Sequence, residues 1–402
     1  MRTPRTGGRS RRRCARSRSL PAALVAAALL AGCAPGTGAA ARTAPAPART
    51  TPATVRTARA PDGAGVAPRG TAPTRTAPTP HGTLLVADFG ADTVTFVDPA
   101  GGPTGSVRVG TAPYGLEVGP DGRAWVATAE GVAVVDTRTR TRVALVPYRT
   151  DTGRPTTGEY RGGGMGVALA PDGSRAYVGV NVPGRNGALE VVDTRQLEVT
   201  AAVPVGRRPF DVDVSRDGRE VYATGHDSFD VTVVPADSLR PRRIEVAPYG
   251  TAGGLGSWLK PHYAAVRPSD GRLLLPFEGE RLVVLDPRTG TSTVEPMTAN
   301  THQHGTAVTP DGTLLVVGTG PVDPAEDGPA SLTVRAPDGR ERIVPLRGPH
   351  EDVAVSADGR TAYVTGGFTR DGSWDGITVV DLGTGTAHRL AAGHRPLGIA
   401  VL

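Results

Sequence analysis

Histidines are the residues of this sequence best suited to chemistry, because five of the chain's eight stand in one kind of place, just before a short apolar segment. These five are His262, His302, His304, His350 and His394. Imidazole nitrogens bind zinc, copper and haem iron, and they carry protons near neutral pH. The sequence therefore offers a transition-metal site or an acid–base site, provided that the fold brings histidines from separate segments together.

The elements that must position these histidines are short β-hairpins that recur along the chain. An Asp-Gly turn between two apolar runs occurs six times, with its aspartate at Asp121, Asp172, Asp217, Asp270, Asp311 and Asp358. Asp-Gly is a strong hairpin signal because glycine takes the positive φ that a tight turn needs. A third run ending in Asp follows, as in 134–136 and 191–193, and then a fourth, as in 142–146. Four strands about every 45 residues predict the blades of an all-β propeller.

The two ends of the repeat region supply a seventh blade. Residues 79–86 read as the second half of a hairpin, and residues 396–402 read as a first strand with no hairpin after it. We therefore predict that 397–401 pairs with 84–88, which closes a seven-bladed ring and removes both free sheet edges. The alternative is an open solenoid of seven repeats.

Several short motifs mark the repeats. Residues 113–122 read PYGLEVGPDG, and Ala-Tyr-Val occurs on the following strand at 176–178 and 362–364. The pattern over residues 81–402 resembles the YVTN-type β-propeller repeat family, which implies a seven-bladed propeller. Similar propellers include sugar lactonases, the large subunit of amine dehydrogenases and the propellers of denitrification enzymes. The resemblance is therefore specific for fold and does not select one activity.

The N-terminal segment predicts export. Residues 2–18 are basic, and the apolar run 20–30 is too short for a membrane span, so residues 1–32 are interpreted as a signal peptide. Leu30, Ala31, Gly32 and Cys33 resemble a bacterial lipobox, which implies a diacylglycerol on the Cys33 thiol and an anchor on the outer face of the cytoplasmic membrane, at the cell surface or in the periplasm. The alternative is an ordinary signal peptide with an incidental cysteine.

Residues 33–80 begin with this cysteine and continue almost wholly in Ala, Thr, Pro, Arg and Gly. Such a segment buries too little apolar surface to offset the entropy of ordering, so we expect a disordered tether, with a glycosylated stalk as the alternative. The propeller is expected to span residues 81–402.

Charge and cysteine content exclude several partners. Residues 1–32 hold eight Arg and no acid, and residues 34–80 hold six Arg and one Asp, so 81–402 carries a net charge of −7. This mildly acidic propeller argues against nucleic acid as a partner. The only cysteines are Cys14 and Cys33, so the propeller has no disulfide and no thiolate ligand. We expect a monomer.

Strand direction indicates where the functional side chains lie. Strands alternate in direction within a blade, so the Asp-Gly turns lie on one face, and the long connections at 148–164, 180–188, 247–262, 318–330 and 366–376 lie on the other, here called the variable face. The innermost strands start at this face, around the central channel. The residues expected at the channel mouth are Tyr114, Arg207, Arg208, Lys260, His262, Tyr263, His302, His304, His350, Glu351 and His394.

Three interpretations of the channel mouth stay open at this point. It is a polar funnel without metal, a transition-metal site formed by His262, His302, His304 and His350, or an acid–base or small-ligand site. His81, His226 and His388 are interpreted as ordinary surface residues.

Function is less defined than fold, because the sequence contains no G-x-S-x-G, H-E-x-x-H or phosphate-loop motif. This favours a non-enzymatic lipoprotein that uses its variable face to bind a protein, glycan or small molecule. One alternative is a metal-binding or redox protein, with a transition metal as the one cofactor. The other is a lactonase-like hydrolase that would use Glu351, Arg207 and Arg208.

Overall fold

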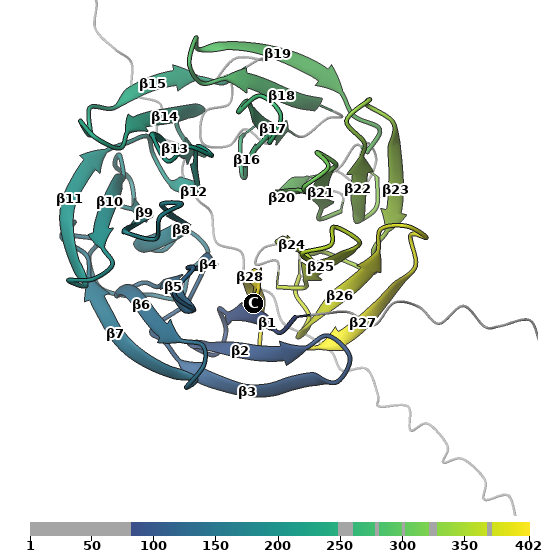
Figure 1. Cartoon of the computed structure of the whole chain (residues 1–402), viewed down its shortest axis with the longest axis horizontal. Helices are drawn as coiled ribbons and strands as arrows, with labels where there is room; N and C mark the ends of the chain where they lie inside the picture. The colour runs from purple at the N-terminus through teal and green to yellow at the C-terminus, as the bar shows by residue number, and fades with distance from the viewer. Residues whose placement is uncertain (1–81, 248–259, 278–280, 300–301, 321–327, 368–371) are drawn as a thin grey trace, which may run out of the picture. The chain divides into compact units, whose positions relative to one another are not determined.

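The structure, a computed structural model, describes residues 82–402 except 248–259, 278–280, 300–301, 321–327 and 368–371. The described residues are all-β and contain no helix. Seven four-stranded antiparallel sheets form a ring around a central channel (Figure 1), so the predicted seven-bladed propeller is confirmed. The predicted signal peptide, the lipobox Cys33 and the tether lie outside the described residues. No helix long and apolar enough to cross a membrane is found in the part of the chain that is described.

The blades are numbered along the chain, and their strands are given from the channel outward. Blade 1 consists of β28 (Pro396–Val401), β1 (Leu84–Asp88), β2 (Thr93–Asp98) and β3 (Gly102–Arg108). Blade 2 consists of β4 (Leu116–Val118), β5 (Arg123–Ala127), β6 (Gly131–Asp136) and β7 (Thr141–Pro147). Blade 3 consists of β8 (Gly163–Leu169), β9 (Arg175–Asn181), β10 (Ala188–Asp193) and β11 (Glu198–Pro204).

The remaining blades follow the same order. Blade 4 consists of β12 (Pro209–Val214), β13 (Glu220–Gly225), β14 (Asp230–Pro235) and β15 (Arg242–Glu245). Blade 5 consists of β16 (Ala265–Val266), β17 (Leu273–Phe277), β18 (Arg281–Asp286) and β19 (Thr291–Pro296). Blade 6 consists of β20 (Gln303–Val308), β21 (Leu314–Gly318), β22 (Ser331–Arg335) and β23 (Glu341–Pro345). Blade 7 consists of β24 (Val353–Val355), β25 (Thr361–Thr365), β26 (Gly376–Asp381) and β27 (Ala387–Ala391).

Blade 1 seals the ring by joining the two ends of the propeller. The last strand β28 pairs antiparallel with β1, with Leu84 opposite Val401 and Val86 opposite Ile399. This is the pairing predicted for 397–401 and 84–88. It leaves no open sheet edge between the first and last blades, and the alternative of an open solenoid is therefore wrong.

The Asp-Gly turns take the conformation that the sequence requires. The glycines of all six turns have positive φ, from 68° at Gly173 to 88° at Gly312. A residue with a Cβ rarely adopts this conformation, so glycine fixes the turn between the first two strands of each of these blades.

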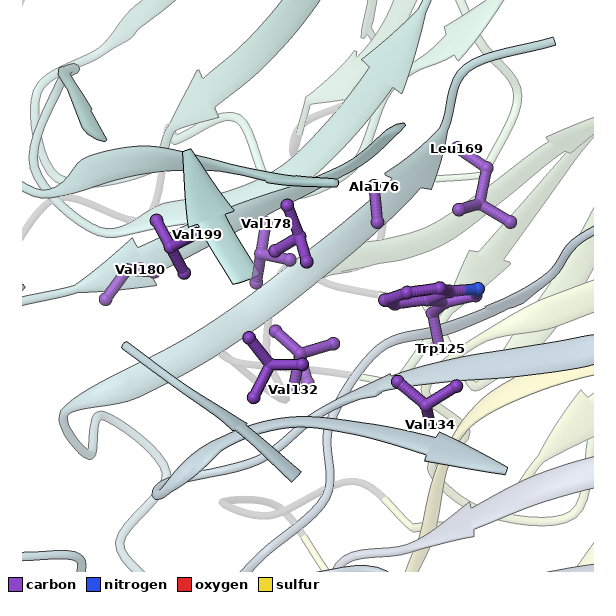
Figure 2. Packing of buried hydrophobic residues seen from close by; sticks show 11 residues of the cluster. Trp125, Val132, Val134, Leu169, Ala176, Val178, Val180 and Val199 are labelled. Atoms are coloured by element: carbon purple, nitrogen blue, oxygen red, sulfur yellow. The ribbon is translucent and has the colours of Figure 1, made fainter. Parts of the chain in front are cut away.

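The core lies between neighbouring blades, where apolar residues of adjacent sheets interdigitate. In the cluster between blades 2 and 3, Trp125 of β5 is 1% exposed and packs with Leu169 and Ala176 of blade 3 (Figure 2). Val132 and Val134 of β6 also belong to its blade 2 side. Each blade covers the apolar face of the next, so the ring fixes the relative positions of the inner strands that reach the channel.

Candidate metal centre

Three of the histidines singled out in the sequence gather in the described structure. His262 comes just before β16 of blade 5, and His302 and His304 stand at the start of β20 of blade 6; all three are 5% exposed or less. One ring nitrogen of each lies within 4.8 Å of one ring nitrogen of both others. The Nε2 atoms of His262 and His302 are 3.3 Å apart, and those of His302 and His304 are 3.4 Å apart. Blades 5 and 6 thus bring three imidazoles together.

A close approach between blades 6 and 7 fixes one side of the cluster. Gly305 donates its backbone N–H to the carbonyl of Glu351, at 2.8 Å. A Cβ at position 305 would lie 2.5 Å from the Asp352 Cα, closer than real contacts allow, so only glycine permits this approach. The start of blade 7 is thereby held against His304.

Glu351 then contacts His304 through its side chain. Its Oε1 lies 3.2 Å from His304 Nδ1 and accepts a hydrogen bond from the Tyr263 hydroxyl at 3.0 Å. The carboxylate and His304 are 1% and 3% exposed. A carboxylate at Nδ1 holds the proton on that nitrogen, which leaves the lone pair on Nε2. With its proton on Nδ1, beside this carboxylate, His304 would present an Nε2 lone pair toward His302.

A fourth histidine, His226, lies against His262 at the edge of this cluster, and the sequence-based interpretation of it as a surface residue was wrong. His226 follows β13 of blade 4 and is 4% exposed. Its Nε2 lies 3.0 Å from His262 Nε2, and its ring stacks on Phe210 with the ring centroids 5.4 Å apart. The sequence analysis missed His226 because it considered only the segments that enter the first strand of each blade. The second strand ends beside that entry, and the backbone N–H of His226 donates to the carbonyl of Arg208.

Asp227 anchors His226 and is itself held by two cations. Its Oδ1 lies 2.9 Å from His226 Nδ1 and 3.1 Å from Lys260 Nζ, and its Oδ2 lies 2.9 Å from Arg208 Nη2. Burial alone would raise the pKa of Asp227, but the bond to His226 and the charges of Arg208 and Lys260 outweigh it and hold that pKa well below its usual range. Burial lowers the pKa of His226 to about 3, so its ring is neutral beside a charged Asp227.

Aromatic side chains pack against the histidine cluster on one side. Phe210 meets the ring of His262 edge-on, with centroids 5.6 Å apart, and meets Tyr263 in the same way at 5.3 Å. Tyr114, expected at the channel mouth, is 3% exposed and lies against Phe210. The histidines thus pack against buried aromatic rings, which limit the access of water to the cluster on that side.

The same aromatic residues, Tyr114, Phe210 and Tyr263, line a cavity of about 150 Å³ together with residues of several inner strands. Asp211, Asp213 and Asp352 face it, and the sequence analysis did not single out these carboxyls as a group. Burial raises the pKa of Asp211 to about 6 and that of Asp352 to about 8. The carboxyl of Asp352 therefore keeps its proton at neutral pH, whereas that of Asp211 is mostly ionised there.

The remaining residues expected at the channel mouth lie outside the cluster. His350, considered a fourth ligand, is fully buried, with Nδ1 2.8 Å from the Gly348 carbonyl and Nε2 2.7 Å from the Thr378 hydroxyl. His394 has a 56% exposed side chain that contacts Asp375. The backbone N–H of Arg207 donates a hydrogen bond to Ser228 Oγ. The structure therefore groups His262, His302 and His304 and does not bring His350 or His394 into the same group.

Comparisons with known proteins agree with the fold. No protein-family model matches the sequence, and no curated protein sequence is significantly similar to it. Among solved structures, the periplasmic gluconolactonase of Pseudomonas aeruginosa is 18% identical over 80% of this chain and 99% of that chain, with a TM-score of 0.57. Virginiamycin B lyase from Staphylococcus aureus is 14% identical over 72% and 88%, with a TM-score of 0.55. Hydrazine synthase of Kuenenia stuttgartiensis is 19% identical over 67% and 76%, with a TM-score of 0.52. At these identities the likeness extends to the propeller fold alone.

The donor set of the cluster suits a borderline transition-metal ion. Its donors are imidazole nitrogens without sulfur, which suit zinc, copper, nickel and iron. Two nitrogens about 2.0–2.1 Å from an ion in a tetrahedral arrangement are about 3.3–3.4 Å apart. The Nε2 separations of 3.3 Å and 3.4 Å match this spacing.

Proposed function

We propose that this protein is a metal-binding β-propeller that holds a transition-metal ion at His262, His302 and His304. The observation that carries the proposal is the convergence of three buried imidazoles, each offering a ring nitrogen within 4.8 Å of the other two. The carboxylate of Glu351 at His304 Nδ1 adds the outer-shell partner that metal-ligating histidines commonly have. A polar funnel without metal would need no such convergence, because solvent could separate its side chains.

Zinc is the ion we favour at this site. The spacing of the Nε2 atoms suits tetrahedral coordination, whereas adjacent ligands of a square-planar copper(II) ion would lie about 2.8–2.9 Å apart. Among the described residues, ligands come from blades 5 and 6, with blade 7 supplying Glu351. A bound ion would join consecutive blades at the variable face.

We also propose that the propeller is exported as a lipoprotein of the YVTN type. This rests on the signal peptide, the lipobox-like residues ending at Cys33 and the repeat motifs, together with the seven-bladed fold. The tether would place the propeller outside the cell at the membrane surface, where the variable face could bind a protein, glycan or small molecule. In this proposal the metal site is part of the binding face and not an enzymatic centre.

We do not propose a lactonase-like activity. The structural likeness to a gluconolactonase is at 18% identity. Of the residues considered for that activity, Glu351 is 1% exposed and engaged by His304 and Tyr263, and Arg208 is paired with Asp227. No specific observation favours a hydrolytic role for them.

Elemental analysis of the purified protein tests the proposal. The wild-type protein, equilibrated with zinc and then desalted, is expected to keep about one equivalent of metal. His302→Ala removes the central imidazole of the cluster and is expected to abolish this retention. His388→Ala alters an exposed histidine of blade 7 and serves as the matched control, with retention unchanged. A wild-type protein that keeps no more metal than His302→Ala would refute the proposal.

A further inference from the structure

We propose that the groove between the outer strands of blades 6 and 7 binds the phosphate group of an organic phosphate monoester. β23 and β27 are the outermost strands of these two blades and follow each other along the rim of the ring (Figure 1). The groove between them has a volume of about 530 Å³, which is within the usual range for ligand sites. None of the described residues that line it belongs to the histidine cluster, so the inference does not rest on the metal ion.

The first argument is the charge of the side chains that line the groove. Arg347, His388 and Arg389 line it and are exposed, and no carboxylate of the described residues does. Asp381, at the end of β26, lies outside the lining and uses its Oδ1 to accept two backbone N–H groups of its own turn. An anionic ligand would therefore meet two guanidinium groups without displacing a carboxylate from them.

The second argument is that two other grooves between blades show a balance of charge that this groove lacks. The groove between blades 5 and 6 is lined by three arginines and three acids, namely Arg216, Arg267, Arg335, Glu295, Asp311 and Asp338. The groove around blade 4 has the same balance, with Arg175, Arg219, Arg288, Asp217, Glu220 and Asp237. In the first of these, Arg335 Nη2 lies 2.7 Å from Glu295 Oε2, so a carboxylate already occupies the guanidinium.

The third argument is that Arg389 is held in place before any ligand binds. Its Nη2 donates to the backbone carbonyl of Arg347, and its Cζ lies 4.2 Å from the centre of the Trp374 ring. Stacking on an aromatic ring and a bond to a carbonyl restrict the rotamers of the guanidinium. Arg389 therefore loses less side-chain entropy when its other nitrogens bind a ligand.

The chemistry of the lining selects the class of ligand. Guanidinium groups match phosphate oxygens in pairs, and a phosphate monoester carries about −1.5 to −2 charges at pH 7, which balances two arginines. Pro345 and Ala387 add exposed apolar surface beside the two arginines. An organic group attached to the phosphate would cover this surface, whereas inorganic phosphate would leave most of the groove to water. A soluble phosphate ester and the headgroup of a membrane lipid both offer this chemistry.

Calorimetric titration tests the proposal with glycerol phosphate as the soluble probe and glycerol as the blank. The metal-free wild type at low ionic strength should bind glycerol phosphate saturably. Arg347→Ala should bind it about tenfold more weakly or worse, because a hydrogen bond between charged groups is lost. Arg216→Ala changes an exposed arginine of the balanced groove between blades 5 and 6 and is the matched control, with affinity unchanged. His302→Ala should also bind as the wild type does, which separates this site from the metal site.

Vesicles of phosphatidylcholine, with and without phosphatidic acid, test the lipid source with the same variants. Arg347-dependent binding to either probe supports the proposal, and the probe that binds identifies the source of the phosphate. Should Arg347→Ala not fold, Arg389→Gln takes its place with the same expectation. If neither probe binds saturably, or if Arg347→Ala and Arg216→Ala weaken binding equally, the proposal is overturned.

Discussion

His226 Nε2 lies 3.0 Å from His262 Nε2, although 36 positions separate the two residues. They meet because the loop that ends the second strand of blade 4 reaches the entry segment of blade 5. The propeller ring, and not the local sequence, creates this contact. The same geometry brings Glu351 of blade 7 to His304 of blade 6, so successive side-chain contacts connect four consecutive blades.

Metal removal should destabilise the propeller, because the proposed ligands come from separate blades. An ion that binds only the folded protein adds about 2.7 kcal/mol when its free concentration is one hundred times the dissociation constant. Dialysis against a chelator should therefore lower the melting temperature of the wild type, and added zinc should restore it. Differential scanning calorimetry provides the measurement, and His302→Ala should show no response to either treatment. An equal response in both proteins would contradict the site.

Glu351 should act on metal affinity through His304. Glu351→Gln keeps an oxygen that can accept the Tyr263 hydrogen bond but loses the negative charge at His304 Nδ1. Removal of such outer-shell carboxylates costs about 10–100-fold in metal affinity. Competition with a coloured chelator measures the dissociation constant, and Glu198→Gln, at an exposed position on β11, is the control. Equal affinities for Glu351→Gln and the wild type would show that Glu351 does not orient a ligand.

The fold could be predicted from the sequence because its signals are local and repeated. Each Asp-Gly turn fixes a hairpin by itself, and the matching half-hairpins at 79–86 and 396–402 indicated the closing pair. The site depends on which residues of different blades meet, and this requires the register of each blade around the ring. The position before an innermost strand indicated His262 and His304 but gave His350 equal weight, because that position does not reveal that Thr378 and the Gly348 carbonyl engage His350.

His226 needed a different kind of reasoning. It follows the second strand of blade 4, and its burial depends on Phe210 packing against its ring and on Asp227 being neutralised by Arg208 and Lys260. A rule that the end of each second strand lies beside the start of its first strand would have found it. Pro209, at the start of β12, pairs with Gly225, which ends β13 and directly precedes His226.

The buried channel carboxyls should make stability fall as pH rises. Burial raises the pKa of Asp352 to about 8, whereas the pKa of an aspartate in an unfolded chain is about 3.9. The folded state therefore binds more protons between these values, and the free energy of unfolding decreases across this window. Asp352→Asn should flatten this dependence and stabilise the metal-free protein at pH 8 by more than about 1 kcal/mol. Urea unfolding at pH 5 and pH 8 measures it, with exposed Asp237→Asn as the control. Parallel pH profiles for Asp352→Asn and the wild type would refute this assignment.

Leu397 should be essential to the closed ring. It lies on β28, is fully buried and packs in the central cluster with Tyr114. Leu397→Ala should reduce the free energy of unfolding by about 2–5 kcal/mol, as buried leucine truncations do. Val143→Ala, at a side chain 48% exposed on β7, should change it by less than about 0.5 kcal/mol. If a denaturant titration showed equal losses of unfolding free energy for Leu397→Ala and Val143→Ala, the role of β28 in closure would be contradicted.

Cys33 should determine where the protein resides. With a diacylglycerol on its thiol, the wild type should remain with the membrane fraction and incorporate labelled palmitate in its native host. Cys33→Ala should lose the label and leave the membrane fraction. If the wild type carried no label and fractionated like the variant, the N-terminus would be an ordinary signal peptide without a lipid anchor.

The most direct test of the central claim is the metal-to-protein ratio of the wild-type propeller beside that of His262→Ala and His302→Ala. After loading with zinc and removal of the excess, inductively coupled plasma mass spectrometry should find about one zinc per wild-type chain and less than about a tenth in either variant. A wild type that retains less than about a tenth of an equivalent of zinc, copper, nickel or iron would contradict the account.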